Sequence, residues 1–231
     1  MNIINRTNKP KILTARNDII AWLDKYEINN YTLTPDDKYG FIVDVHGNVD
    51  LYNKSLKNIP IKFNTINGFF NCSVNNLTSL EFCPKNIHGS FYCDNNKLTN
   101  LEFCPKNING NFYCGCNKLT SLEFCPKTVN GYFNCGNNNL SSLKFCPDTI
   151  NGSFFCDNNN LTSLEFFPKA VNGTSYFGSN ELTGLDMSKE YGFTEIYKIH
   201  CEHKIIAEQS KLEGIIEDKD RYKNTNRKIK I

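Results

Sequence analysis

The sequence predicts a β-solenoid, in which the chain winds as a coil and each turn contributes a parallel strand. One pattern recurs every 21 residues, without insertion or deletion, over residues 45–185. Each copy holds a single segment in which apolar and polar residues alternate, as they do in a short half-buried strand. Because one such segment occurs per copy, successive strands are expected to be parallel.

The repeat is plainest in "LTSLEFCPKNIHGSFYCDNNK" (77–97), which returns directly as "LTNLEFCPKNINGNFYCGCNK". Glycine and leucine each hold one position in seven consecutive copies. They are Gly47, Gly68, Gly89, Gly110, Gly131, Gly152 and Gly173, and Leu56, Leu77, Leu98, Leu119, Leu140, Leu161 and Leu182. A fixed period of this kind is typical of repeat architectures.

The strand is expected after each glycine. In "SFYCD", Phe91 and Cys93 belong to one face and Tyr92 to the other. The preceding Asn-Gly pairs are typical of antiparallel hairpins, but the single strand per copy argues against hairpins here. The glycine is expected to permit a tight corner or a positive φ.

An asparagine occurs three residues after the strand cysteine position in six copies. These residues are Asn75, Asn96, Asn117, Asn138, Asn159 and Asn180. A side-chain amide offers two donors and an acceptor. A stacked column of asparagines is therefore expected to satisfy backbone groups that lose their partners where the chain leaves the strand.

These motifs resemble the leucine-rich repeat. Its L-x-x-N-x-L pattern appears here as "CDNNKL" and "CGNNNL", with cysteine in place of the strand leucine. The 21-residue unit is similar to short repeats encoded by phages, giant viruses and some bacteria. The resemblance implies a scaffold for binding surfaces rather than one particular activity. It also implies a viral or phage product that acts in the host cytoplasm.

Four segments are predicted along the chain. Residues 1–44 form an N-terminal cap with a helix over Asn17–Ile28, and a strand, a turn and a strand then lead into the coil. Residues 45–185 form about seven turns, residues 186–218 a C-terminal cap, and residues 219–231 a flexible basic tail. Caps are expected because both ends of a solenoid expose strand edges and apolar faces.

Composition limits the range of partners. The 231 residues carry a net charge of +2, which gives no overall attraction to nucleic acid. No apolar run approaches the roughly 20 residues that cross a bilayer, and the N-terminus has no secretory signal pattern. We therefore expect a cytoplasmic protein with reduced thiols and no membrane partner.

Nine of the 11 cysteines fall into two columns, which we expect to be packed in the coil. They are Cys72, Cys93, Cys114, Cys135 and Cys156 on the strand, and Cys83, Cys104, Cys125 and Cys146 farther along the coil. Zinc needs four ligands that converge, whereas a column sets them in a line. No metal or cofactor is therefore predicted. Cys116, in "FYCGCNK", fits neither column and is expected to be a free thiol at the rim of the strand face.

The sequence does not favour an enzyme. "IHCEH", with His200, Cys201 and His203, is the one Cys/His cluster, and strand neighbours point to opposite faces. No phosphate-binding loop or dinucleotide-binding glycine motif occurs.

Charged residues also form columns. Glu81, Glu102, Glu123 and Glu165 share one position, and Lys85, Lys106, Lys127 and Lys169 follow four residues later. One copy reverses both signs, with Lys144 and Asp148. The double reversal predicts ion pairs within each turn, which would stabilise the surface.

The outward strand face is the predicted protein-binding site. It presents Phe69, Tyr92, Tyr113, Tyr132, Phe155 and Tyr176, with Asp94 and Asp157 beside them. This composition resembles the cores of protein interfaces. Alternatively, the aromatics only stabilise neighbouring strands. A rival surface is the column of Phe82, Phe103, Phe124, Phe145 and Phe166.

The expected function is therefore that of a non-enzymatic protein-binding module. Two alternatives stay open. The basic tail "KDRYKNTNRKIKI" (219–231) suggests contact with nucleic acid, and the viral resemblance suggests a structural component of a virion. The identity of the partner and the oligomeric state are not specified by the sequence.

Overall fold

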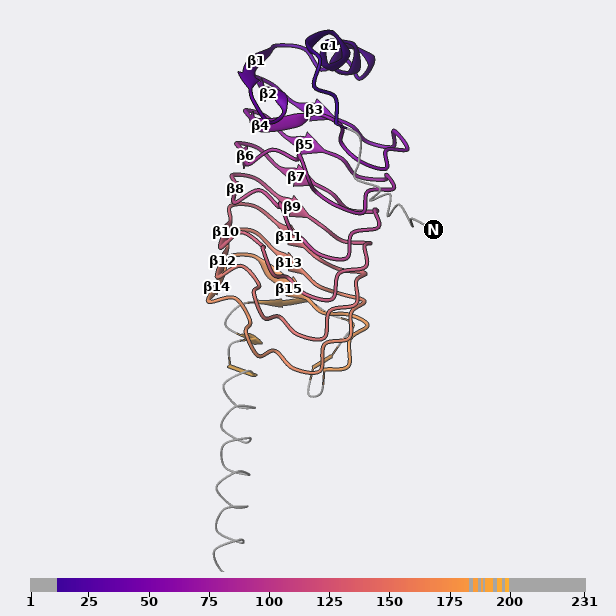
Figure 1. Cartoon of the computed structure of the whole chain (residues 1–231). Helices are drawn as coiled ribbons and strands as arrows, with labels where there is room; N and C mark the ends of the chain where they lie inside the picture. The colour runs from indigo at the N-terminus through magenta and orange to yellow at the C-terminus, as the bar shows by residue number, and fades with distance from the viewer. Residues whose placement is uncertain are drawn as a thin grey trace, which may run out of the picture. The chain divides into compact units, whose positions relative to one another are not determined.

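The computed structural model describes residues 12–182, 185–186, 188, 190–192, 195–196 and 198–199. The chain divides into two compact units, Met1–Tyr191 and Gly192–Ile231. The first unit holds a β-solenoid of about six turns with parallel strands about 21 residues apart (Figure 1). This confirms the predicted fold class. Most of the predicted C-terminal cap, residues 186–218, lies outside the described residues.

A helix and an antiparallel strand pair cover the first turn of the coil. Helix α1 spans Arg16–Lys25, and β1 (Tyr31–Asp36) pairs with β2 (Gly40–Val45). The helix buries Ile19 and Leu23 and sets the Trp22 ring 6.3 Å from that of Phe63. These elements therefore shield the open end of the core from solvent.

Each turn contributes two short strands, which form two walls. The first wall consists of β3 (Val49–Asp50), β5 (Phe70–Asn71), β7 (Phe91–Tyr92), β9 (Phe112–Tyr113), β11 (Phe133–Asn134), β13 (Phe154–Phe155), β15 (Thr174–Tyr176) and β16 (Glu190–Gly192). The second consists of β4 (Lys62–Ile66), β6 (Asn86–Ile87) and β8 (Asn107–Ile108), in one sheet with β1 and β2, and of β10 (Thr128–Val129), β12 (Thr149–Ile150) and β14 (Ala170–Val171).

The prediction of a single strand segment per copy is therefore wrong. The second strand is two residues long in most turns, as in Asn86–Ile87, and two residues are too few to show alternation. The Asn-Gly pairs lie between the two walls and form no hairpin. The parallel pairing predicted for the first wall is confirmed, for example between β7 and β9.

Six of the seven repeated glycines, all but Gly47, are required by close approach of the backbone rather than by a positive φ. Gly40, in the cap, is the one described glycine with positive φ. A Cβ atom built on Gly89 would lie 2.7 Å from the carbonyl carbon and oxygen of Gly68 in the preceding turn. A side chain at this corner would push neighbouring turns apart.

Stacked phenylalanines fill the core behind the first wall. Phe70, Phe91, Phe112, Phe133 and Phe154 are fully buried, and successive rings lie 5.5–6.1 Å apart. In the last turn Ser175 takes this position, and Phe167 and Phe177 occupy the two cysteine positions. Their rings lie 5.9 Å from each other and about 6 Å from that of Phe154. The exchange keeps the stack filled at its end.

The asparagine column forms the predicted network with the backbone. Asn138 Nδ2 donates to the carbonyl oxygens of Cys114, Cys135 and Gly136 at 3.2, 3.0 and 3.3 Å. Its Oδ1 accepts a hydrogen bond from the Leu119 N–H at 2.9 Å. One amide thus joins two consecutive turns at the point where the strand ends, which confirms the prediction from the sequence.

Replacing Asn138 with alanine is expected to lower the free energy of unfolding by about 2–4 kcal/mol, because buried backbone groups lose their partners. Chemical denaturation measures this change. Asn107→Ala is the matched control, since Asn107 is exposed and the same column carries Ala170. The control should change stability by less than about 0.5 kcal/mol. Equal losses in the two variants would contradict a special role for the column.

Candidate protein-binding surfaces

Three of the six predicted aromatics on the strand face form a continuous run. The rings of Phe69 and Tyr92 meet edge to face at 6.3 Å, and those of Tyr92 and Tyr113 stack at 5.2 Å. All three side chains are half-buried. The regular spacing of the turns holds the rings in place, and their outer surfaces stay open to solvent.

The other three aromatics on this face are separate. Among the described residues, no aromatic ring contacts those of Tyr132, Phe155 or Tyr176. Tyr132 is 47% exposed, and its backbone N–H donates to Asn111 Oδ1 at 2.9 Å. The structure therefore divides the six predicted aromatics into one run of three and three single residues.

The two predicted carboxylates are fixed by neighbouring side chains. The Ser73 hydroxyl donates to Asp94 Oδ1 at 2.5 Å, and Asn95 Nδ2 donates to Asp94 Oδ2 at 2.8 Å. Asp157 Oδ2 accepts from Asn158 Nδ2 at 2.8 Å. These bonds orient the acceptors at the edge of the strand face.

The Tyr113 hydroxyl is a neutral hydrogen-bond donor at neutral pH. Burial raises the pKa of Tyr113, with smaller contributions from Tyr92, Tyr132 and Asp94. The strand face therefore presents aromatic rings and phenol groups, and its negative charge lies at its edge.

Cys116 is the exposed free thiol that the sequence predicts. It occupies a position with positive φ in every turn, and its own φ is 50°. Asn95, Asn137 and Asn158 hold this position in other turns, and asparagine tolerates positive φ. Burial, then Asp94 and Asp157, raises the pKa of the Cys116 thiol.

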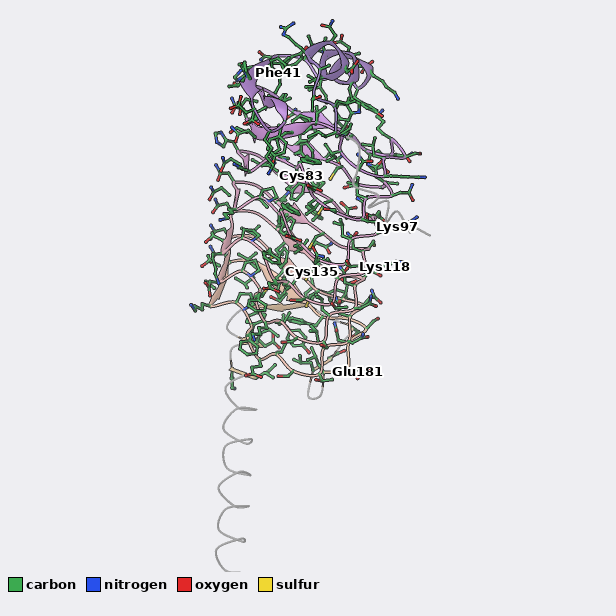
Figure 2. All side chains as sticks on the ribbon, viewed as in Figure 1. Phe41, Cys83, Lys97, Lys118, Cys135 and Glu181 are labelled. Atoms are coloured by element: carbon green, nitrogen blue, oxygen red, sulfur yellow. The ribbon has the colours of Figure 1, made fainter. Side chains whose placement is uncertain are left out.

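The two cysteine columns pack inside the coil, as the pattern predicts, and Figure 2 labels one member of each, Cys83 and Cys135. All nine members are free thiols, eight buried and Cys125 half-buried. Burial raises the pKa of Cys114 and Cys156 well above the usual thiol value. Among the residues with described placement, no group of three or more His, Cys, Asp or Glu side chains could hold a metal ion.

The rival surface is a column of exposed phenylalanines in an unusual backbone conformation. We call Phe103, Phe124, Phe145 and Phe166 the phenylalanine ladder; they are 51%, 53%, 43% and 50% exposed. Their φ angles are 67°, 71°, 69° and 65°. For a bulky residue, a positive φ costs on the order of 1–3 kcal/mol.

A β-turn imposes this conformation in five consecutive turns of the coil, at Phe82 and at the four residues of the phenylalanine ladder. The N–H of Cys104 donates to the carbonyl oxygen of Leu101 at 2.9 Å, with Phe103 as the third residue of the turn. A positive φ there belongs to a type II turn, which favours glycine or asparagine. The sequence did not reveal this turn, because "LEFC" contains neither residue.

The predicted ion pairs within a turn are wrong. Among the described glutamates and lysines of the two charge columns, no ion pair joins members of one turn. Lys169 Nζ instead lies 3.0 Å from Asp148 Oδ1 in the preceding turn, and it lowers the pKa of Asp148. Lys144 Nζ lies 5.1 Å from the centre of the Phe145 ring. Reversed charges thus interrupt each column of like charges along the coil axis.

Two predicted features fall outside the described residues. They are the His200, Cys201 and His203 cluster and the basic tail 219–231. Within the described segments, no helix is long and apolar enough to cross a membrane.

The fold and its surfaces define a repeat protein of the parallel β-solenoid class. Comparisons of the chain with protein-family models, curated proteins and solved structures gave no match.

Cys116 is expected to react with a thiol reagent faster than any of the nine column cysteines, because the latter are packed inside the coil. The labelling rate should rise with pH, because only the thiolate reacts. Since the Cys116 pKa is raised, this rise should lie at a higher pH than for an ordinary thiol. Peptide mapping by mass spectrometry follows each cysteine separately. Faster labelling of Cys114 than of Cys116 in the folded protein would contradict this assignment.

Phe124→Gly is expected to be more stable than Phe124→Ala by about 1 kcal/mol, because glycine adopts positive φ without strain. Both variants lose the same packing of the ring. Thermal denaturation compares the two proteins. Leu119 offers a control position with a buried side chain outside the positive-φ positions, where alanine should equal or exceed glycine in stability. The same order at both positions would show that the turn is not strained.

Proposed function

We propose that this protein is a non-enzymatic protein-binding module of the leucine-rich-repeat class, with the strand face as its binding surface. The observation that carries the proposal is the continuous run of Phe69, Tyr92 and Tyr113. Tyrosine-rich patches of this kind contribute a large share of the binding energy at protein interfaces.

The arrangement of the rings suits a protein partner. The rings are already ordered by stacking, so their side chains lose little conformational entropy on binding. Each tyrosine offers an apolar ring and a hydroxyl donor. Asp94 and Asp157 add fixed acceptors at the edge, and these carboxylates would repel the phosphates of a nucleic acid. A polypeptide with exposed apolar and hydrogen-bonding groups is therefore the favoured ligand.

The proposal extends to the origin of the protein. Similarity of the 21-residue unit to phage and giant-virus repeats supports a viral or phage product. Such a product would engage a host or virion protein in the host cytoplasm.

The test replaces both stacked tyrosines, as Tyr92→Asn with Tyr113→Asn. Asparagine is the natural residue of this column at Asn71 and Asn134, so the fold should survive. Wild-type and variant proteins are used to co-purify partners from the native source cells, with quantification by mass spectrometry. We expect the variant to co-purify at least about tenfold less of its specific partner than the wild type does. Removing a central aromatic pair from an interface has an effect of this size.

The matched control is Phe103→Asn with Phe124→Asn, which removes two exposed rings from the other surface. It should retain the partner. If the tyrosine variant is folded, as judged by an unchanged melting temperature, and yet retains every partner, the strand face is not the binding surface.

A further inference from the structure

The phenylalanine ladder is not explained by folding alone. Each of its four rings leaves about half of its surface in water, while its backbone has the positive φ that glycine or asparagine adopts more readily. Because the rings are exposed, much of the free energy that burial of a phenylalanine ring contributes to folding is not gained. The turn adds backbone strain. Because four consecutive turns each hold a phenylalanine with both disadvantages, we infer that the rings act in a contact outside the coil.

The first member of the same column shows how such a ring is covered. Phe82 has the same turn and a φ of 72°, yet it is only 8% exposed. The Tyr39 ring, in the turn between β1 and β2, meets it edge to face at 5.8 Å. The N-terminal cap therefore covers one ring with another aromatic ring. Among the described residues, no aromatic ring covers the four rings of the ladder, and only Phe145 has a cation over it, Lys144 Nζ at 5.1 Å from the ring centre.

Along the chain, an acidic residue precedes each ring in most turns of the ladder and a basic residue follows it. Along each turn the chain runs from Glu102 through Phe103 to Lys106, and the next turn repeats this order with Glu123, Phe124 and Lys127. The glutamates and lysines of these turns are exposed, and none of them is paired within its turn. Stacking of the turns in this order arranges these residues as an acidic stripe, an apolar stripe and a basic stripe along the coil.

These stripes are complementary to themselves in one orientation. A two-fold axis parallel to the coil turns the surface face to face and exchanges left with right, so the acidic stripe of one copy meets the basic stripe of the other. A two-fold axis across the coil would instead set acidic against acidic. Because like charges repel, only the parallel arrangement is favourable.

We propose that the phenylalanine ladder is a self-association surface, through which two copies of this chain form a parallel, two-fold symmetric dimer with ladder against ladder. Glu102 of one copy then faces Lys106 of the other, at the same height along the coil. The flexible stem of lysine lets its ammonium group reach across the edge of the ring stripe.

The double charge reversal supports this arrangement. In the parallel dimer, equivalent turns face each other, so Lys144 of one copy meets Asp148 of the other. The two reversals are then complementary across the interface, although no ion pair joins them within the chain. Within its own chain, Asp148 contacts Lys169 and Lys144 lies over the Phe145 ring, but neither contact requires both reversals to occur in the same turn.

The area indicates a reversible dimer. About half of the surface of each ladder residue is exposed, so the four residues offer roughly 300–500 Å² per copy. Together with the flanking charges, the contact approaches the roughly 1,000 Å² in total that specific interfaces require. We expect a dissociation constant of about 10–100 μM at low ionic strength.

Sedimentation equilibrium of the full-length chain tests the surface. Phe103→Asn with Phe124→Asn should weaken the dimer by about a hundredfold or more, because two rings are lost from each copy. Asparagine accepts positive φ, so the melting temperature should not fall. Tyr92→Asn with Tyr113→Asn is the control and should leave the dimer unchanged. Monomer at every concentration up to about 500 μM in the wild type, or a dimer insensitive to the phenylalanine changes, would overturn the proposal.

A charge-exchange cycle tests the orientation. Lys144→Glu and Asp148→Lys, each alone, should weaken the dimer by about tenfold, since each sets like charges against each other across the interface. The combined variant restores opposite charges and should return to within about threefold of the wild type. If the two effects simply add, the charges do not pair between copies, and the parallel arrangement is wrong.

Zero-length carbodiimide cross-linking gives a direct readout. A mixture of ¹⁴N- and ¹⁵N-labelled protein should yield hybrid peptides that join Glu102 of one copy to Lys106 of the other. Hybrid peptides that join opposite ends of the coil would instead indicate an antiparallel dimer and contradict the proposal. The strand-face variant keeps this cross-link whether or not it binds a protein partner, so the two proposals fail independently.

Discussion

Hydrogen bonding between consecutive turns is the interaction on which the rest of the structure depends. In the first wall, the N–H of Phe91 donates to the Asn111 carbonyl at 2.8 Å, and the N–H of Cys93 donates to the Tyr113 carbonyl at 2.9 Å. Such ladders fix neighbouring strands about 4.8 Å apart. A residue type that repeats every turn therefore becomes a column of like side chains in contact. The size, polarity and charge of that residue type then determine the character of a whole wall of the coil.

That spacing decides which side chains each column accepts. Phenylalanine rings fit the core because nearly parallel rings stack at about the separation of the turns, and small thiols pack beside them. The asparagine column is required where the strand ends, because its amides bond the backbone groups of two turns at once. Glycine is required at the corner, because there the main chains come closest. Charged columns are the least compatible with the spacing, and Asp148 among lysines relieves their repulsion.

The sequence predicts those features that depend on repetition and hydrogen-bonding capacity. Parallel winding, the buried cysteine columns and the role of Asn138 all follow from the residue type at a fixed position. Features that depend on local backbone geometry cannot be predicted from the residue type at a fixed position. The second strand of each turn is too short for a pattern, and the positive φ of Phe103 lacks the usual glycine or asparagine. Ion pairing was wrongly predicted because closeness along the chain does not fix side-chain separation at a corner.

Positions that hold a residue other than the most stabilising one distinguish the candidate surfaces from the structural columns. Where packing governs, as at Phe112 or Asn138, the residue in place is also the one that stabilises its turn. The strand face departs by presenting stacked tyrosines where Asn71 and Asn134 suffice for the same backbone. The phenylalanine ladder departs further, because its rings are both exposed and conformationally strained. A solenoid repeats such a cost in every turn, so strain that persists over four turns indicates a contact formed along the whole stripe. A second coil with the same spacing matches that stripe turn for turn, which a globular partner without the repeat would not.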